Sequence, residues 1–160
     1  MSSNRAEIYK SKIEKYSSKL DQFGGKKGGI KTFEDILKIF FEHQLAIKLL
    51  HFTTKKFSAH KILDDYLSEF RGYVDHFMEV AQGLGDKPKR IDVGSSMSLS
   101  INSPTDSNIN KFLEDFIKMV SDDGEIRNMI KEMNNNNGLV ATLDEMAGSA
   151  QKVKYLLTFN

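Results

Sequence analysis

Both prolines of this 160-residue chain, Pro88 and Pro104, fall in one stretch, residues 84–106, which also carries glycine, serine and asparagine. Proline removes a backbone donor and clashes with the preceding helical turn, so this stretch is predicted to be extended. On both sides of it, apolar side chains recur at the three- to four-residue spacing of amphipathic helices. The chain is therefore predicted to be all-α, with two helical halves joined by one long crossover.

Four main helices are predicted from this periodicity, with a short fifth one before the last. Their ranges are about 32–57, 60–82, 107–121, 125–133 and 139–158. Thr32 and Asp35 have the spacing of a capping box, so the first helix should begin at Thr32. Ser58 is the candidate N-cap of the second helix, because serine side chains accept hydrogen bonds from free helix-start donors. Short interconnections of this kind place successive helices antiparallel in a bundle.

The first 31 residues differ in charge from the rest of the chain. They hold eight lysines and arginines against three acidic residues, a net charge of +5, while the whole chain carries +1. An apolar stripe predicts a helix at about 4–22, and the "GGKKGG" run then breaks it. We therefore divide the chain into a basic helical arm with a glycine-rich hinge, residues 1–31, and a bundle, residues 32–160. The arm is a candidate for contacts with DNA phosphates, and the alternative is a solvated helix face with a flexible hinge.

Composition excludes several classes of function. The chain has no cysteine, so disulfides, thiolate zinc sites and cysteine nucleophiles are excluded. No apolar run approaches the roughly 18 residues of a membrane span, and no secretory signal opens the chain. No glycine-rich phosphate loop or nucleophile motif appears. We expect no membrane partner and a location in the cytoplasm or inside a viral particle.

Metal-competent side chains share one face of the helix predicted at 60–82. At 100° per residue, His60, Asp64, Asp75 and Glu79 fall within an arc of about 100°. Asp64 and Asp75 are eleven residues apart, or about 16 Å along the helix, so one metal site cannot include both. An antiparallel two-fold partner would bring Asp75 and Glu79 of one chain to His60 and Asp64 of the other. The preceding helix supplies a further histidine, His51.

The run His51-x8-His60-x3-Asp64-x10-Asp75-x3-Glu79 resembles that of Dps, the mini-ferritins. The text "HKILDDYLSEFRGYVDHFMEVAQG" is similar to the second helix of a Dps subunit. The resemblance implies a ferritin-like four-helix bundle, here with an extra N-terminal helix and a long crossover. It also implies that His51, His60 and Asp64 bind metal from one subunit and that Asp75 and Glu79 come from the two-fold mate.

The resemblance further implies that the protein oxidises and sequesters ferrous iron at inter-subunit sites, mono-iron or di-iron, and protects against peroxide. The metal ligands would be the only catalytic groups, and the partners would be other copies of the chain, in a two-fold dimer or a dodecameric shell. The two histidines are nine residues apart where Dps usually has twelve, and Phe52 stands where Dps commonly has tryptophan.

A second interpretation assigns no cofactor. Similar sequences occur in small proteins of large viruses and tailed phages, which favours a non-enzymatic, ferritin-like structural or interaction protein of a particle. Under this interpretation the four carboxylate and imidazole groups of the second helix are an ordinary polar face. His51 is then a hydrogen-bonded core histidine.

Overall fold

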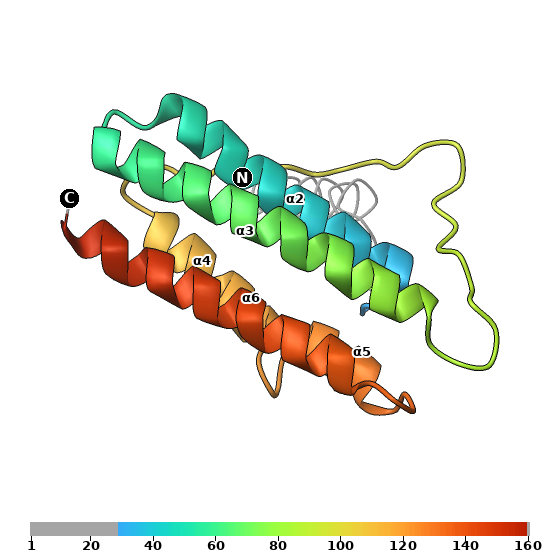
Figure 1. The fold of residues 1–160 in the computed structure, drawn as a ribbon. Helices are drawn as coiled ribbons and strands as arrows, with labels where there is room; N and C mark the ends of the chain where they lie inside the picture. Colours follow the sequence, from blue (N-terminus) through green and yellow to red (C-terminus); the bar gives the residue numbers. More distant parts are fainter. Residues whose placement is uncertain (1–28, 160) are drawn as a thin grey trace, which may run out of the picture.

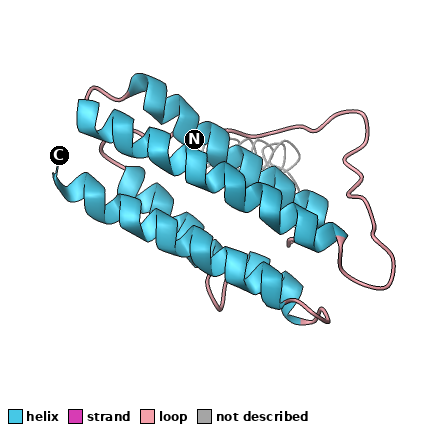
Figure 2. Ribbon diagram, viewed as in Figure 1, coloured by secondary structure: helices cyan, strands magenta, loops and turns pink. Residues whose placement is uncertain are grey.

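The computed structural model describes residues 29–159, so the helix predicted at 4–22 lies outside the described residues. Between residues 29 and 159 the fold contains helices and no strand (Figures 1 and 2). The elements are α2 (Phe33–Thr53), α3 (Phe57–Gln82), α4 (Ile109–Val120), α5 (Glu125–Lys131), α6 (Asn137–Leu156) and the 3₁₀ turn η1 (Leu157–Phe159). The all-α prediction is confirmed.

The helices form two layers, with α2 beside α3 in one layer and α4, α5 and α6 in the other (Figure 1). The α3 helix packs on both α2 and α6, and α4 packs on α6. The long crossover between α3 and α4 is also confirmed. Two of its backbone N–H groups, at Asp92 and Ser100, donate to Glu34 and Glu42 of α2 at 3.0 and 2.7 Å. The crossover therefore runs along α2 and is held to it by these two hydrogen bonds.

The start of α2 follows the predicted capping box. The Asp35 N–H donates to Thr32 Oγ1 at 3.1 Å, and the Thr32 N–H donates back to Asp35 Oδ2 at 3.0 Å. The next boundary was predicted wrongly, because α2 ends at Thr53 and α3 begins at Phe57. Ser58 therefore lies inside α3, and Lys56 is its N-cap residue. The His60 N–H already donates to the Lys56 carbonyl at 2.9 Å, which starts α3 two residues earlier than Ser58 would.

Aromatic side chains fix α2 against the rest of the bundle. Phe40 of α2 is fully buried and meets Phe70 and Phe77 of α3 edge to face, with ring centroids 6.0 and 5.3 Å apart. Phe116 of α4 lies 6.4 Å from the same ring. Burying each such side chain contributes about 1.5–3 kcal/mol, and edge-to-face pairs add about 0.5–1.5 kcal/mol each. This core holds α2 and α3 in a fixed register, on which the geometry described next depends.

Candidate metal centre

The three-residue turn between α2 and α3 brings His51 and His60 ring to ring, with centroids 3.9 Å apart. The Nδ1 atom of each ring is hydrogen-bonded to the backbone carbonyl oxygen of the other residue. His60 Nδ1 lies 2.9 Å from the His51 oxygen, and His51 Nδ1 lies 3.2 Å from the His60 oxygen. A carbonyl oxygen only accepts, so both Nδ1 atoms carry a proton. In the neutral rings both Nε2 atoms therefore keep a lone pair, which is the form of histidine that binds metal ions.

Asp64 lies one turn after His60 on α3 and faces the same pair. Its Oδ1 is 3.9 Å from His51 Nε2, too far for a hydrogen bond. Two metal–ligand bonds of about 2 Å each would span that distance. Lys48 Nζ of α2 is also 3.9 Å from this carboxylate, so a cation already balances its charge. The structure thus brings three of the five predicted ligands to the α2–α3 turn.

The other two predicted ligands, Asp75 and Glu79, lie farther along α3. Both are exposed, and α3 is unbroken between Asp64 and Asp75, so their backbones are about 16 Å apart. Within residues 29–159 no group of three His, Asp or Glu side chains lies close enough to hold a metal ion. A single copy of the chain therefore does not assemble the five residues into one centre, and the three at the α2–α3 turn do not form a metal-binding group by themselves either.

An exposed apolar stripe runs along α2 beside these residues. Phe41, Leu45, Leu49 and Phe52 follow one another at three- or four-residue spacing and are 37, 38, 43 and 67% exposed. A cavity of about 360 Å³ separates this stripe from α3, and its lining includes Leu45, Lys48 and Asp64. Contiguous apolar surface of this kind marks contact sites for other proteins. Leu45 of the apolar stripe and the predicted ligand Asp64 thus line the same cavity between α2 and α3.

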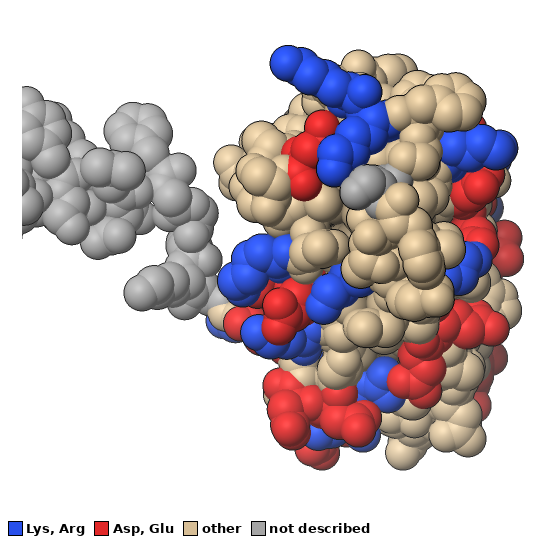
Figure 3. Space-filling view, turned by 90° about the vertical axis from the view of Figure 1, so that its left-hand side faces the viewer, with Lys and Arg blue, Asp and Glu red and all other residues tan. Residues whose placement is uncertain are grey.

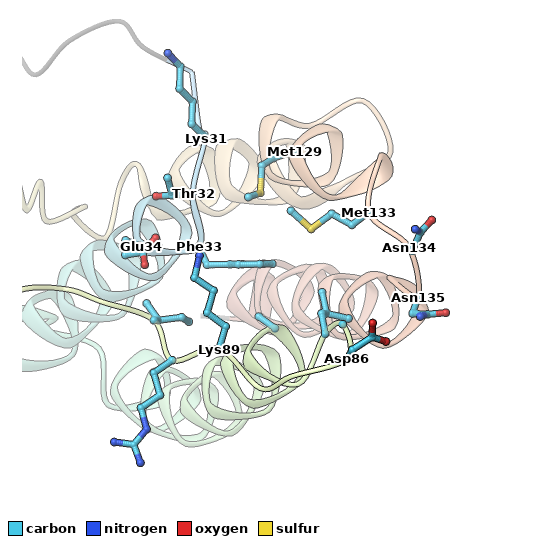
Figure 4. A pocket seen from close by; sticks show the side chains of 15 residues that line it. Lys31, Thr32, Phe33, Glu34, Asp86, Lys89, Met129, Met133, Asn134 and Asn135 are labelled. Carbon is cyan, nitrogen blue, oxygen red and sulfur yellow. The ribbon is translucent and has the colours of Figure 1, made fainter.

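Another cavity, with a volume of about 730 Å³, lies at the opposite end of the bundle. Figure 4 shows its apolar lining, Phe33 with Met129 and Met133, and its charged rim, which includes Lys89 and Asp86. Its lining contains no histidine. This cavity therefore lacks the mixed imidazole and carboxylate donors that iron accepts.

The sequence patterns give no information about the surroundings of His43 of α2. Its ring is buried and stacks on Phe112 and Phe116 of α4, with centroids 5.2 and 3.9 Å away. Its Nε2 lies 2.8 Å from the Tyr66 hydroxyl. Burial lowers the pKa of His43 to about 3, so the ring is neutral at physiological pH. No local sequence pattern predicts these contacts, because the partners of His43 come from two other helices.

Surface charge does not concentrate at the end of the bundle that carries the α2–α3 turn. Figure 3 shows Lys and Arg interspersed there with Asp and Glu. The basic arm predicted at residues 1–31 lies almost wholly outside the described residues, so its proposed DNA contact stays a prediction. Among the described helices none is long and apolar enough to cross a membrane.

Comparison with known proteins gives one match. A model described as a family of unknown function (DUF5856) matches residues 51–157. No curated protein and no solved structure matches the chain. The matched region begins at His51 and includes His60, Asp64, Asp75 and Glu79, so it covers every predicted metal ligand.

Proposed function

We propose that this chain, which belongs to the family of unknown function DUF5856, is a Dps-like protein that binds, oxidises and sequesters ferrous iron between two copies. The observation that carries the proposal is the His51–His60 pair. Both rings have Nδ1 fixed on a backbone carbonyl, which is how proteins orient histidines whose Nε2 binds metal. Imidazole with carboxylate is a donor set that suits iron or manganese.

Each residue has a separate part in this proposal. His51 and His60 would hold the metal through Nε2, and Asp64 would supply a charged oxygen from the same chain. Asp75 and Glu79 of a second copy would complete the site and stabilise the ferric product. Ferrous iron is the substrate: two ferrous ions give the two electrons that, with two protons, reduce one hydrogen peroxide to two waters.

The need for a second copy follows from distance and from the apolar stripe. About 16 Å of helix separates the two halves of the ligand set, which an antiparallel two-fold contact along α3 would bring together. Phe41, Leu45, Leu49 and Phe52 would be buried in the same contact, which removes their apolar surface from water. The ferritin-like bundle of the proposal has this α2–α3 layer on its dimer face.

The test is anaerobic ferrous loading of the full chain, with bound iron and particle mass measured on the same sample. We expect about one site per subunit, since two equal sites form in each dimer. His60→Ala and Asp64→Asn should lose the iron. His76→Ala and Asp65→Asn are matched controls, because both residues are exposed on α3 outside the proposed site, and these variants should keep it. Equal iron in His60→Ala and His76→Ala would refute the proposal.

A second candidate function is a non-enzymatic building block of a larger particle. Lys48 favours it, because a lysine 3.9 Å from Asp64 satisfies that carboxylate without a metal. The exposed apolar stripe favours it equally, since a structural contact would also cover the stripe. A particle that forms normally and binds no iron would support this function over the first.

A further inference from the structure

A separate cavity of about 220 Å³ lies between α2, α4 and the crossover. Apolar side chains make up most of its lining, among them Ile39, Ala46, Phe112 and Met119. None of the five predicted iron ligands reaches it. This cavity therefore needs an explanation independent of the proposed iron site.

The crossover forms a fixed wall of this cavity. The Ser100 N–H donates to Glu42 Oε1 at 2.7 Å. The Ser103 hydroxyl lies 3.1 Å from the Pro104 carbonyl and 3.5 Å from the Ala46 carbonyl of α2. Ser100 and Asn102 line the cavity, so these bonds hold its outer side against α2. Three elements thus line the space, which is partly open to solvent.

His43 supplies a polar group inside this apolar space. It lines the cavity, is 5% exposed, and its Nε2 is bonded to the Tyr66 hydroxyl. Among residues 29–159 no group is bonded to the other ring nitrogen, Nδ1, and none but His43 is bonded to the Tyr66 hydroxyl. If Nε2 held the proton, the Tyr66 proton would be buried without an acceptor, which costs about 1–3 kcal/mol. Tyr66 therefore donates to Nε2, and the neutral His43 ring carries its proton on Nδ1.

We propose that this cavity binds a small, uncharged, mostly apolar molecule whose one acceptor atom receives the hydrogen bond from His43 Nδ1. An apolar cavity of about 150 Å³ holds benzene, so this volume suits a single substituted ring. The acceptor would replace the solvent that reaches Nδ1, because no buried side-chain nitrogen or oxygen among the described residues lacks a partner. Glu42 and Asp115 also line the cavity, and their negative charges disfavour anionic ligands.

Three one-ring probes test the proposal: acetophenone, which has an acceptor; ethylbenzene, which has none; and benzoate, which is an anion. Each is titrated into the full chain, with the methyl signals of Ala46 and Met119 followed by NMR. One hydrogen bond is worth roughly three- to ten-fold in affinity. The ratio of acetophenone to ethylbenzene affinity should therefore fall by that factor in His43→Phe. Asp115→Asn should strengthen benzoate binding.

Two further variants complete the test, one that fills the cavity and one that serves as a control. Ala46→Leu fills the cavity and should abolish binding of all three probes, and it carries the test if His43→Phe does not fold. Ser68→Ala is the control. Ser68 belongs to α3 and lines the cavity on the other side of α2, so this variant should leave binding unchanged. An acetophenone preference unaltered in His43→Phe, probe binding that survives Ala46→Leu, or no shift at Ala46 and Met119 up to millimolar probe would each overturn the proposal.

Discussion

His43 and His51 lie on the same helix, eight residues or about 12 Å apart, but the protein uses opposite nitrogens of the two rings. At His43 the bonded atom is Nε2, and its partner is the Tyr66 hydroxyl. At His51 the bonded atom is Nδ1, and its partner is the His60 carbonyl. The atom left over differs accordingly: an N–H at His43 and a lone pair at His51.

The comparison shows that the bonded partner decides what a histidine is able to bind. A carbonyl only accepts, so it fixes the proton on the atom that contacts it and leaves a metal-binding lone pair on the other. A hydroxyl both donates and accepts, so the proton position at His43 depends on whether Tyr66 has another partner. One helix thus carries a site suited to a cation and a site suited to a neutral acceptor.

The largest effect is expected from mixing two inactive variants. One chain carries His60→Ala with Asp64→Asn, and the other carries Asp75→Asn with Glu79→Gln. Each alone should bind no iron. After unfolding and refolding together, half of the dimers are mixed and each has one intact site, so about a quarter of the sites should return. Iron analysis of the refolded mixture measures this directly.

The control for this mixing experiment is each variant refolded alone, at the same total protein concentration. If the mixture binds no more iron than these controls, Asp75 and Glu79 do not complete a site on the mate. Iron binding by the Asp75→Asn, Glu79→Gln chain alone would show instead that the α2–α3 turn holds iron without them.

A second prediction concerns pH. The ordinary pKa of histidine is 6.5, and burial lowers that of His43 to about 3. Below pH 6.5 the unfolded chain therefore binds a proton that the folded chain does not, so stability is present above pH 6.5 and is lost as the pH falls. The free energy of unfolding should drop by as much as about 1.4 kcal/mol per pH unit from this residue. Urea unfolding of the wild type and of His43→Phe between pH 6.5 and 5 measures the difference.

The other titratable groups are common to both proteins, so the comparison isolates His43. Parallel curves for the two proteins would mean that His43 is solvated in the folded state. A steeper fall in the wild type would confirm that it is buried as the neutral ring.

Local patterns predicted the ends of several elements but not the surroundings of the histidines. The Thr32 capping box and the end of α3 at Gln82 depend on residues within one turn, and both are where the sequence indicates. The α3 start was missed because Lys56 makes no side-chain cap that a pattern would reveal. Helical periodicity placed His60 and Asp64 on one face, yet the reciprocal bonds with His51 depend on the turn between the helices. His43 meets residues 23 and 73 positions away, which no periodicity reports.

The third prediction compares the loss of stability when the side chain of His43 or of His60 is truncated to alanine. His43→Ala should lower the free energy of unfolding by about 3 kcal/mol, because it leaves a cavity between four aromatic rings and a buried hydroxyl without a partner. His60→Ala should cost less than about 1 kcal/mol in the metal-free protein, since His60 is exposed. Urea unfolding of both variants at pH 7 gives the two values. Equal losses would contradict the contrast between a core and a surface histidine.

A smaller effect than that of His43→Ala is expected from Tyr66→Phe, which removes only the hydroxyl that contacts His43. Losing one buried hydrogen bond should cost about 1 kcal/mol. The pH dependence of stability should nevertheless persist, because burial and not this bond lowers the pKa of His43. The freed Nε2 also allows either nitrogen to carry the proton, so the preference for acetophenone over ethylbenzene should weaken without disappearing. Urea unfolding at pH 7 and pH 5, with the same probe titration, separates these effects. If Tyr66→Phe removed the pH dependence, the hydroxyl and not the apolar surroundings would be what keeps His43 neutral.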